Sequence, residues 1–162
     1  MTIKVNIQSD RKNREVFAHI DNIKEATERG VRRGFFRAGA IIVKEARRSI
    51  IKGPKTGRVY KISGRRRKHR SSAPGEPPAN LTGQLQKSTG FLISGSSEMK
   101  IGAGGADGII HAHASKNVKY ARRLELGDSK VKARPYLIRA IENKKKDTEL
   151  AFENGIKELL KE

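Results

Sequence analysis

Two histidines, His111 and His113, stand two residues apart and are the first side chains that could do chemistry. On a β-strand both would lie on the same face, which is the arrangement that a metal-binding pair needs. Metal sites take three or four ligands, however, and Asp107 is the only carboxylate within six residues of the pair. We therefore expect two solvent-facing histidines rather than a metal site.

Two other stretches have the residue types of a catalytic or phosphate-binding loop without the surrounding pattern. The SGSS tetrapeptide at residues 94–97 lacks the strand–turn–helix context of a nucleophile elbow. The GAGGADG stretch at residues 102–108 has no Gly-Lys-Ser/Thr ending, and no helical pattern opens directly after it. The chain has no cysteine, which excludes disulfides, zinc-finger ligation and thiol catalysis. We expect no enzymatic activity and no cofactor.

The strongest chemical feature is the positive charge of the stretch 53–90. Between Ala46 and Gly75 there are eleven Lys or Arg residues and no acidic residue. Only Tyr60 and His69 offer aromatic surface there, whereas proteins that bind single strands interleave stacking aromatic residues with their charge. Sequence-specific recognition of nucleic acid is therefore not expected. The residues predicted to contact a partner or DNA are Lys55, Arg58, Arg65, Arg66, Arg67, Lys68 and Arg70.

From its residues alone, this basic arm has three interpretations. It is a solvated arm that aids solubility, an arm that contacts phosphates without specificity, or an arm that becomes ordered against an acidic protein surface. The net charge is +19, and residues 1–75 hold 21 Lys or Arg against 6 Asp or Glu. Residues 76–162 hold 15 against 11. This asymmetry indicates a basic surface that faces something anionic.

The composition bounds the class of protein. A chain of 162 residues corresponds to about one domain, and 35% hydrophobic with 33% charged residues predicts a small core with exposed arms, or a core completed by neighbouring subunits. No apolar run approaches the roughly 18–20 residues that cross a bilayer. The N-terminus has no signal-peptide apolar block. We expect a single-domain, soluble protein made in a cytoplasm, without a membrane partner.

The elements before the basic stretch are a strand and a long helix. Alternating residues at 3–8 predict a half-buried strand, and residues 16–20 fit either a short strand or the approach to a helix. Apolar residues at helical spacing predict a helix over about 22–51. Gly30 and Gly34 lie four apart on its apolar face, so a neighbouring backbone could approach closely there. That neighbour is either the protein's own sheet or another subunit.

The elements after residues 53–80, predicted as an extended basic and proline-rich loop, complete an α+β fold. Residues 81–85 predict a short helical turn, and residues 91–93 and 99–101 predict a β-hairpin. A short helix is expected over 118–126 and a long one over about 135–160, opened by Pro135. We therefore predict a small antiparallel sheet packed by two long helices.

Four motifs between residues 55 and 137 resemble one protein family. They are KTGRVY at 55–60, HRSSAPGEPPANLTGQL at 69–85, YARRLELG at 120–127 and ARPYL at 133–137. In this order they resemble the tailed-bacteriophage neck proteins that are called head–tail joining, tail-completion or minor tail component proteins. The chain departs from the family at Leu126, where an aromatic residue is usual, and at Tyr136, where Phe is usual.

The resemblance implies a non-enzymatic virion protein of the neck or tail, assembled in the cytoplasm of a bacterial host. Such a protein would form a homo-oligomeric ring of six or twelve copies between the portal end of the capsid and the tail tube. Its partners would be other neck, connector or tail-tube proteins, with non-specific contact to passing DNA. The alternative is a stand-alone, non-specific nucleic-acid-binding module.

Overall fold

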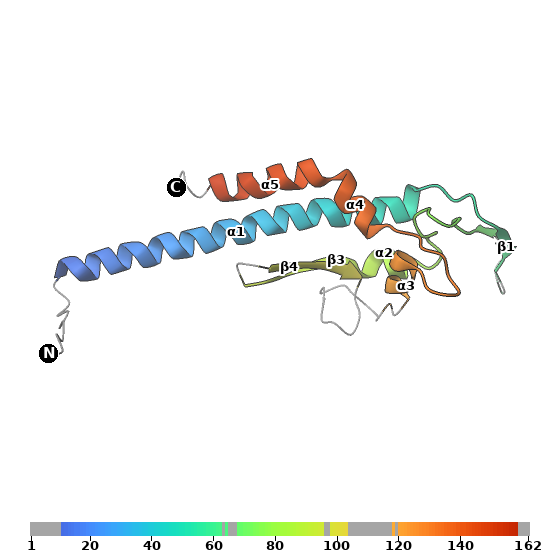
Figure 1. Cartoon of the computed structure of the whole chain (residues 1–162), viewed down its shortest axis with the longest axis horizontal. Helices are drawn as coiled ribbons and strands as arrows, with labels where there is room; N and C mark the ends of the chain where they lie inside the picture. Colours follow the sequence, from blue (N-terminus) through green and yellow to red (C-terminus); the bar gives the residue numbers. More distant parts are fainter. Residues whose placement is uncertain are drawn as a thin grey trace.

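The fold is built along one helix, α1 (Arg11–Lys52), which has 42 residues and is about 63 Å long at 1.5 Å per residue. The computed structural model describes residues 11–62, 64, 68–95, 98–103, 118 and 120–158. Helices α4 and α5 lie along one side of α1 and the hairpin β3–β4 lies along the other (Figure 1). The predicted α+β class, with helices packed on antiparallel strands, is confirmed.

Helix α1 begins at Arg11 and not near residue 22 as predicted. The stretch 16–20, for which strand and helix were both open, is helical. The reason is that no glycine or proline interrupts residues 11–29, while Val16, Ile20 and Ile23 keep the three-to-four-residue spacing of a helix. The C-terminal end at Lys52 agrees with the prediction to within one residue.

The contact between α1 and α5 (Lys145–Lys157) is unusually close because two glycines meet there. A Cβ atom added to Gly155 would lie 2.6 Å from Cα of Gly34, which is closer than a real side chain approaches. Beside this contact Phe35 packs on Phe152 with ring centroids 5.1 Å apart. The glycines thus let the two backbones approach, and the aromatic pair closes the edge of the contact.

The C-terminal helical region is divided, and the prediction of one continuous helix over 135–160 is wrong at Lys144. The structure has α4 (Leu137–Asn143) and α5, with φ −111° and ψ 12° at Lys144 between them. Neither glycine nor proline stands at this break. Both helices pack on α1, and Figure 1 shows them at an angle to each other. The bend therefore follows from packing two helices on one.

The predicted hairpin is confirmed as β3 (Thr89–Ser94) and β4 (Glu98–Ala103), which pair antiparallel with Phe91 opposite Ile101. Phe91 packs edge-on against Phe36 of α1, with ring centroids 5.6 Å apart. The hairpin can approach α1 because Gly39 has no side chain, and a Cβ there would lie 2.7 Å from the Phe91 ring.

A second antiparallel pair, β1 (Val59–Lys61) and β2 (Lys68–Arg70), lies within the stretch predicted as an extended loop. It forms a sheet separate from β3–β4, so the prediction of one small sheet is incomplete. We call this pair the basic ribbon. The strand predicted at residues 3–8 lies outside the described residues.

Two short helices, α2 (Gln84–Ser88) and α3 (Ala121–Leu126), close the core at the C-terminal end of α1, near their predicted places. Tyr136 is the largest side chain buried there, with 2% of its surface exposed. Its burial raises the pKa of its phenol. The core cluster consists of Ile42, Ala46, Ile50, Leu85, Val118, Ala121, Tyr136 and Ala140.

Candidate contact surfaces

Glu76 joins the two limbs of the basic stretch. Its carboxylate accepts hydrogen bonds from the Thr56 hydroxyl at 2.6 Å, the Thr56 amide at 2.9 Å and the Ala73 amide at 2.8 Å. These donors, the Thr56 hydroxyl foremost, lower the pKa of Glu76 below its ordinary value. The ionised carboxylate therefore holds the chain around Thr56 against the chain around Ala73.

A β-turn from Ala73 to Glu76 connects this contact to the ARPYL motif at residues 133–137. The Glu76 amide donates to Ala73 O at 3.1 Å, with Pro74 and Gly75 at the two central positions. Gly75 has a φ of 81°, a conformation that glycine adopts without strain. Its amide donates to Ala133 O at 2.8 Å, so the ARPYL motif is tied directly to this turn.

Glu125 of the YARRLELG motif closes the start of α4. Its carboxylate accepts hydrogen bonds from the amides of Tyr136, Leu137 and Ile138, at 3.0, 3.1 and 2.8 Å. The first amides of a helix have no partner within the helix, and the positive end of the helix dipole favours an anion. Glu125 therefore satisfies three donors and sets the direction in which α4 leaves the ARPYL motif.

Arg134 adds a further link between motifs, since its Nε donates to Ser72 O at 3.3 Å and its amide donates to Leu124 O at 2.6 Å. The four motifs KTGRVY, HRSSAPGEPPANLTGQL, YARRLELG and ARPYL therefore meet in one hydrogen-bonded unit, although they span more than eighty positions of the sequence. We call this unit the motif cluster; it consists of Thr56, Ser72, Ala73, Gly75, Glu76, Leu124, Glu125, Ala133, Arg134, Tyr136, Leu137 and Ile138.

Lys55, a predicted contact residue, directs its ammonium group into the protein. Its Nζ lies 3.4 Å from Ser49 O and 3.4 Å from Pro77 O. Burial lowers the pKa of Lys55, although the nearby Glu76 carboxylate acts in the opposite direction. The ammonium lies at the C-terminal end of α1, where the helix dipole favours a cation. Its geometry is therefore that of a structural cap.

Gly34, predicted with Gly30 to pack against a neighbour, contacts α5 of its own chain through Gly155. The close backbone approach that the spacing indicated is therefore present, with a helix rather than a sheet as the neighbour. Gly30 is buried. A role for either glycine between subunits stays a prediction.

The basic ribbon presents like charges directly opposite each other. In its register Lys61 faces Lys68 and Val59 faces Arg70. All four side chains are exposed, and like charges opposite each other on neighbouring strands destabilise a pair. On the other face Tyr60 and His69 stack edge-on with ring centroids 5.4 Å apart, which supports the pairing.

Of the remaining predicted contact residues, three lie on or beside the basic ribbon and three lie outside the described residues. Arg58 is exposed at the base of the ribbon, where its carbonyl accepts from the Ser71 amide at 3.0 Å. Lys68 and Arg70 lie exposed on β2. Arg65, Arg66 and Arg67, like the His111 and His113 pair, lie outside the described residues.

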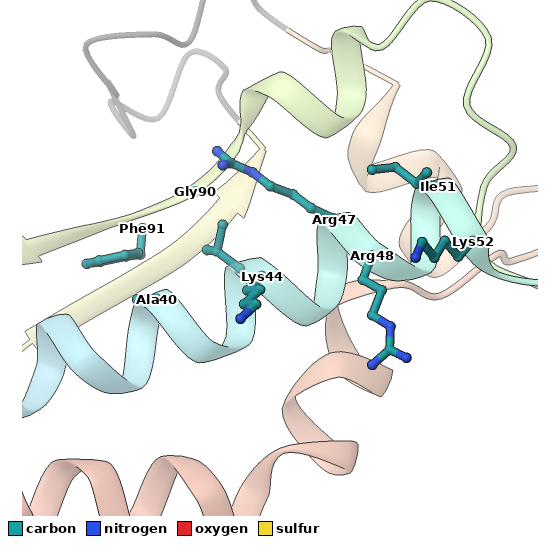
Figure 2. A pocket seen from close by; sticks show the side chains of 9 residues that line it. Ala40, Lys44, Arg47, Arg48, Ile51, Lys52, Gly90 and Phe91 are labelled. Carbon is teal, nitrogen blue, oxygen red and sulfur yellow. The ribbon is translucent and has the colours of Figure 1, made fainter.

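A groove of about 500 Å³, which the sequence did not lead us to expect, runs between the C-terminal part of α1 and the start of β3. Its apolar lining includes Val43, Ile51 and Phe91, and no acidic residue lines it. Figure 2 shows Arg47 extending toward β3, where it donates to Thr89 O at 2.7 Å. We call this groove the cationic groove, after the four cations that line it, Lys44, Arg47, Arg48 and Lys52.

Within the described part of the chain, no group of three or more His, Asp or Glu side chains is arranged to hold a metal ion. Among the same residues, no helix has the length and apolar character that crossing a bilayer requires. Among the described residues, we take the basic ribbon and the cationic groove as the candidate contact surfaces.

Comparison with known proteins adds no name to these surfaces. No family model, no curated protein and no solved structure matches the chain.

Proposed function

We propose that this chain is a structural virion protein of a tailed bacteriophage that forms a ring in the neck, completes the tail and joins it to the head. The observation that carries the proposal is the motif cluster. The four segments whose sequences resemble neck proteins are the segments that hydrogen-bond to one another through Glu76, Glu125 and Ala133. That the four motifs also meet in space supports treating them as one set, which is how the resemblance to neck proteins uses them.

The motif cluster also suggests how such a protein would act. It joins the base of the basic ribbon to the start of α4, and Lys55 joins the same stretch to Ser49 of α1. The ribbon therefore projects from a supported base at one end of an elongated molecule (Figure 1). Six or twelve such ends arranged in a ring would present a belt of positive charge. An adjoining ring with an acidic surface, or the DNA that passes through the neck, is the matching partner.

The decisive experiment removes the gene from the phage or prophage genome that carries it. We expect the resulting lysates to contain DNA-filled heads and finished tails that are not joined, as seen by negative-stain electron microscopy. Purified protein added to these lysates should restore joined, infectious particles. Normal particles in the deletion lysate would overturn the proposal.

A stand-alone nucleic-acid-binding module is the second candidate, and the opposed Lys61 and Lys68 of the basic ribbon favour it. Two like charges held opposite each other gain most from a polyanion that lies across both. This candidate predicts that the purified monomer binds duplex DNA with a steep salt dependence. If binding vanishes at about 0.15 M salt and appears only in assembled rings, the neck protein is the better description.

A further inference from the structure

We propose that the N-terminal half of α1 pairs with the same segment of a second copy of this chain, with the two helices antiparallel and residues 14–29 of each side by side. The pairing goes beyond the proposed neck function and does not rest on it. Three observations carry it, namely the spacing of residues on one face of α1, the way α5 covers part of that face, and the charge of the segment.

The face of α1 that packs on α5 has the spacing of a coiled-coil seam. Six residues follow one another at alternating steps of four and three positions: Val16, Ile20, Ile23, Thr27, Gly30 and Gly34. This is the repeat with which two helices pack side by side. Gly34 meets Gly155 of α5, and Gly30 is buried.

The first four residues of the seam are not covered by the described part of the chain. Val16, Ile20 and Ile23 are between 52% and 56% exposed, and Thr27 is exposed as well. The Thr27 hydroxyl donates to Ile23 O at 2.8 Å, so its burial would leave no donor unpaired. We call these four residues the open seam.

The protein itself shows which kind of element covers this seam. Ala140 lies in the core with Ile50, and Gly155 meets Gly34, so the chain of α4 and α5 runs antiparallel to α1. Figure 1 shows α1 continuing well beyond the end of α5. A further antiparallel helix would therefore continue the same packing along the open seam. A parallel pair in register would instead bring the Gly34 positions of two copies together, where each is already covered by its own α5.

The charge of the segment lets two copies of a strongly basic chain meet. The chain carries +19, which opposes association over most of its surface. Residues 14–29 hold three Lys or Arg and four Asp or Glu, a net charge of −1. The acidic residues Asp21, Glu25 and Glu28 are exposed on the side of α1 away from the open seam. The open seam can therefore be buried without burying a charge.

One register of the antiparallel pair buries the whole open seam in both copies. When Ile20 of one copy lies opposite Ile23 of the other, Val16 lies opposite Thr27, and residues 14–29 overlap completely over about 24 Å. A shift by one heptad in one direction would place Val16 opposite Gly34, where α5 already lies. A shift in the other direction would place Thr27 beyond the first residue of the other α1.

This register brings no like charges together at the edges of the pair. Phe17 of one copy lies beside Lys24 of the other, whose aliphatic stem can cover the ring, and His19 lies beside Ala26. Both copies contribute the same surface, so the contact is isologous and closes at two copies. It describes a dimer of the free chain, and a neck ring would form through a different contact.

The first experiment measures the mass of the purified full chain by sedimentation equilibrium over a concentration series. We expect a dimer whose dissociation constant changes little between low and high salt, because the seam is apolar. Ile20→Asp places a carboxylate in both central layers and should weaken dimerisation on the order of 100-fold. Leu150→Asp, at a similarly exposed apolar position on α5, should leave the mass unchanged. Both variants should keep the circular dichroism of the folded chain.

The second experiment tests direction and register by disulfide cross-linking, since the chain has no cysteine of its own. A mixture of Val16→Cys and Thr27→Cys should form a disulfide dimer under mild oxidation. Val16→Cys alone should not, because the two copies of position 16 lie about 16 Å apart along the pair and a disulfide needs Cα atoms within about 7 Å. Ala18→Cys mixed with Glu25→Cys is the matched control, at equivalent levels on the outer side, and should stay monomeric under oxidation.

A wild type that stays monomeric at all concentrations would overturn the inference, as would a Leu150→Asp variant that dissociates. Cross-linking of Val16→Cys alone, or none in the mixture with Thr27→Cys, would overturn the antiparallel register. The gene-deletion assay is independent of these results. A dimeric protein whose deletion leaves joined particles would contradict the neck function and leave the helix pairing standing.

Discussion

The Glu76 carboxylate holds Thr56 by two hydrogen bonds, at 2.6 Å to the hydroxyl and 2.9 Å to the amide, across twenty positions of sequence. This pair closes the base of the basic ribbon. Both residues belong to motifs described above, Thr56 to KTGRVY and Glu76 to HRSSAPGEPPANLTGQL, and in this structure their role is to join those motifs.

The Glu76–Thr56 contact predicts a specific pH dependence. The pKa of Glu76 is lowered by folding, so its contribution to stability is complete above the unfolded pKa of about 4.5 and is lost as the pH falls through the lowered folded value. The E76Q variant should unfold at a lower temperature than the wild type at neutral pH. The difference should shrink as the pH falls below 4.5. A difference that does not change with pH would contradict this account.

Removal of the Glu125 carboxylate should expose three helix amides. We expect Glu125→Ala to lower the free energy of unfolding by about 1–3 kcal/mol, because the amides of residues 136–138 lose a charged acceptor close to the core. Urea denaturation followed by circular dichroism measures this. Glu142→Ala, an exposed position on α4, is the matched control and should change stability by less than about 0.5 kcal/mol.

The glycine contact between α1 and α5 predicts that adding one methyl group at Gly155 would force the two helices apart. Alanine at Gly155 would gain up to about 1 kcal/mol in helix propensity. Its Cβ would nevertheless lie 2.6 Å from Gly34, and overpacking of this kind costs about 1–3 kcal/mol. We therefore expect Gly155→Ala to lower the thermal midpoint, whereas Asn154→Ala, on the exposed side of α5, should leave it unchanged or raise it.

Neutralising the basic arm should impair joining without unfolding the protein. Arg65, Arg66, Arg67 and Lys68 changed together to glutamine should leave heads and tails separate in micrographs. In the DNA-binding alternative, Lys61, Lys68 and Arg70 changed to glutamine should reduce the salt slope by about 0.9 for each phosphate that the protein no longer neutralises. If the glutamine variant of residues 65–68 gave normal joined particles with normal infectivity, the role assigned to the arm would be wrong.

The sequence predicted the α+β class, the β3–β4 hairpin and the C-terminal end of α1, because periodicity and glycine–proline stops are local signals. It missed the break at Lys144, since nothing in the local sequence marks a bend that comes from packing two helices on α1. It also missed the basic ribbon, because Lys61 and Lys68 on neighbouring strands are unfavourable by any local rule.

The candidate surfaces were predictable in part. The density of Lys and Arg pointed to the arm, but charge alone could not show that the Lys55 ammonium turns inward to Ser49 and Pro77. Glu76 carried a usable signal, because it is the first acidic residue after the long acid-free stretch. The cationic groove had no such signal, since it forms only where β3 meets α1.

The length of α1 beyond its packed part has a consequence for local stability along the helix. Isolated helices of about 12–15 residues are marginal in water, and most helical stability in proteins comes from tertiary packing. Backbone amides of residues 16–28 should therefore exchange with solvent deuterium far faster than those of residues 34–50, although one unbroken helix holds both.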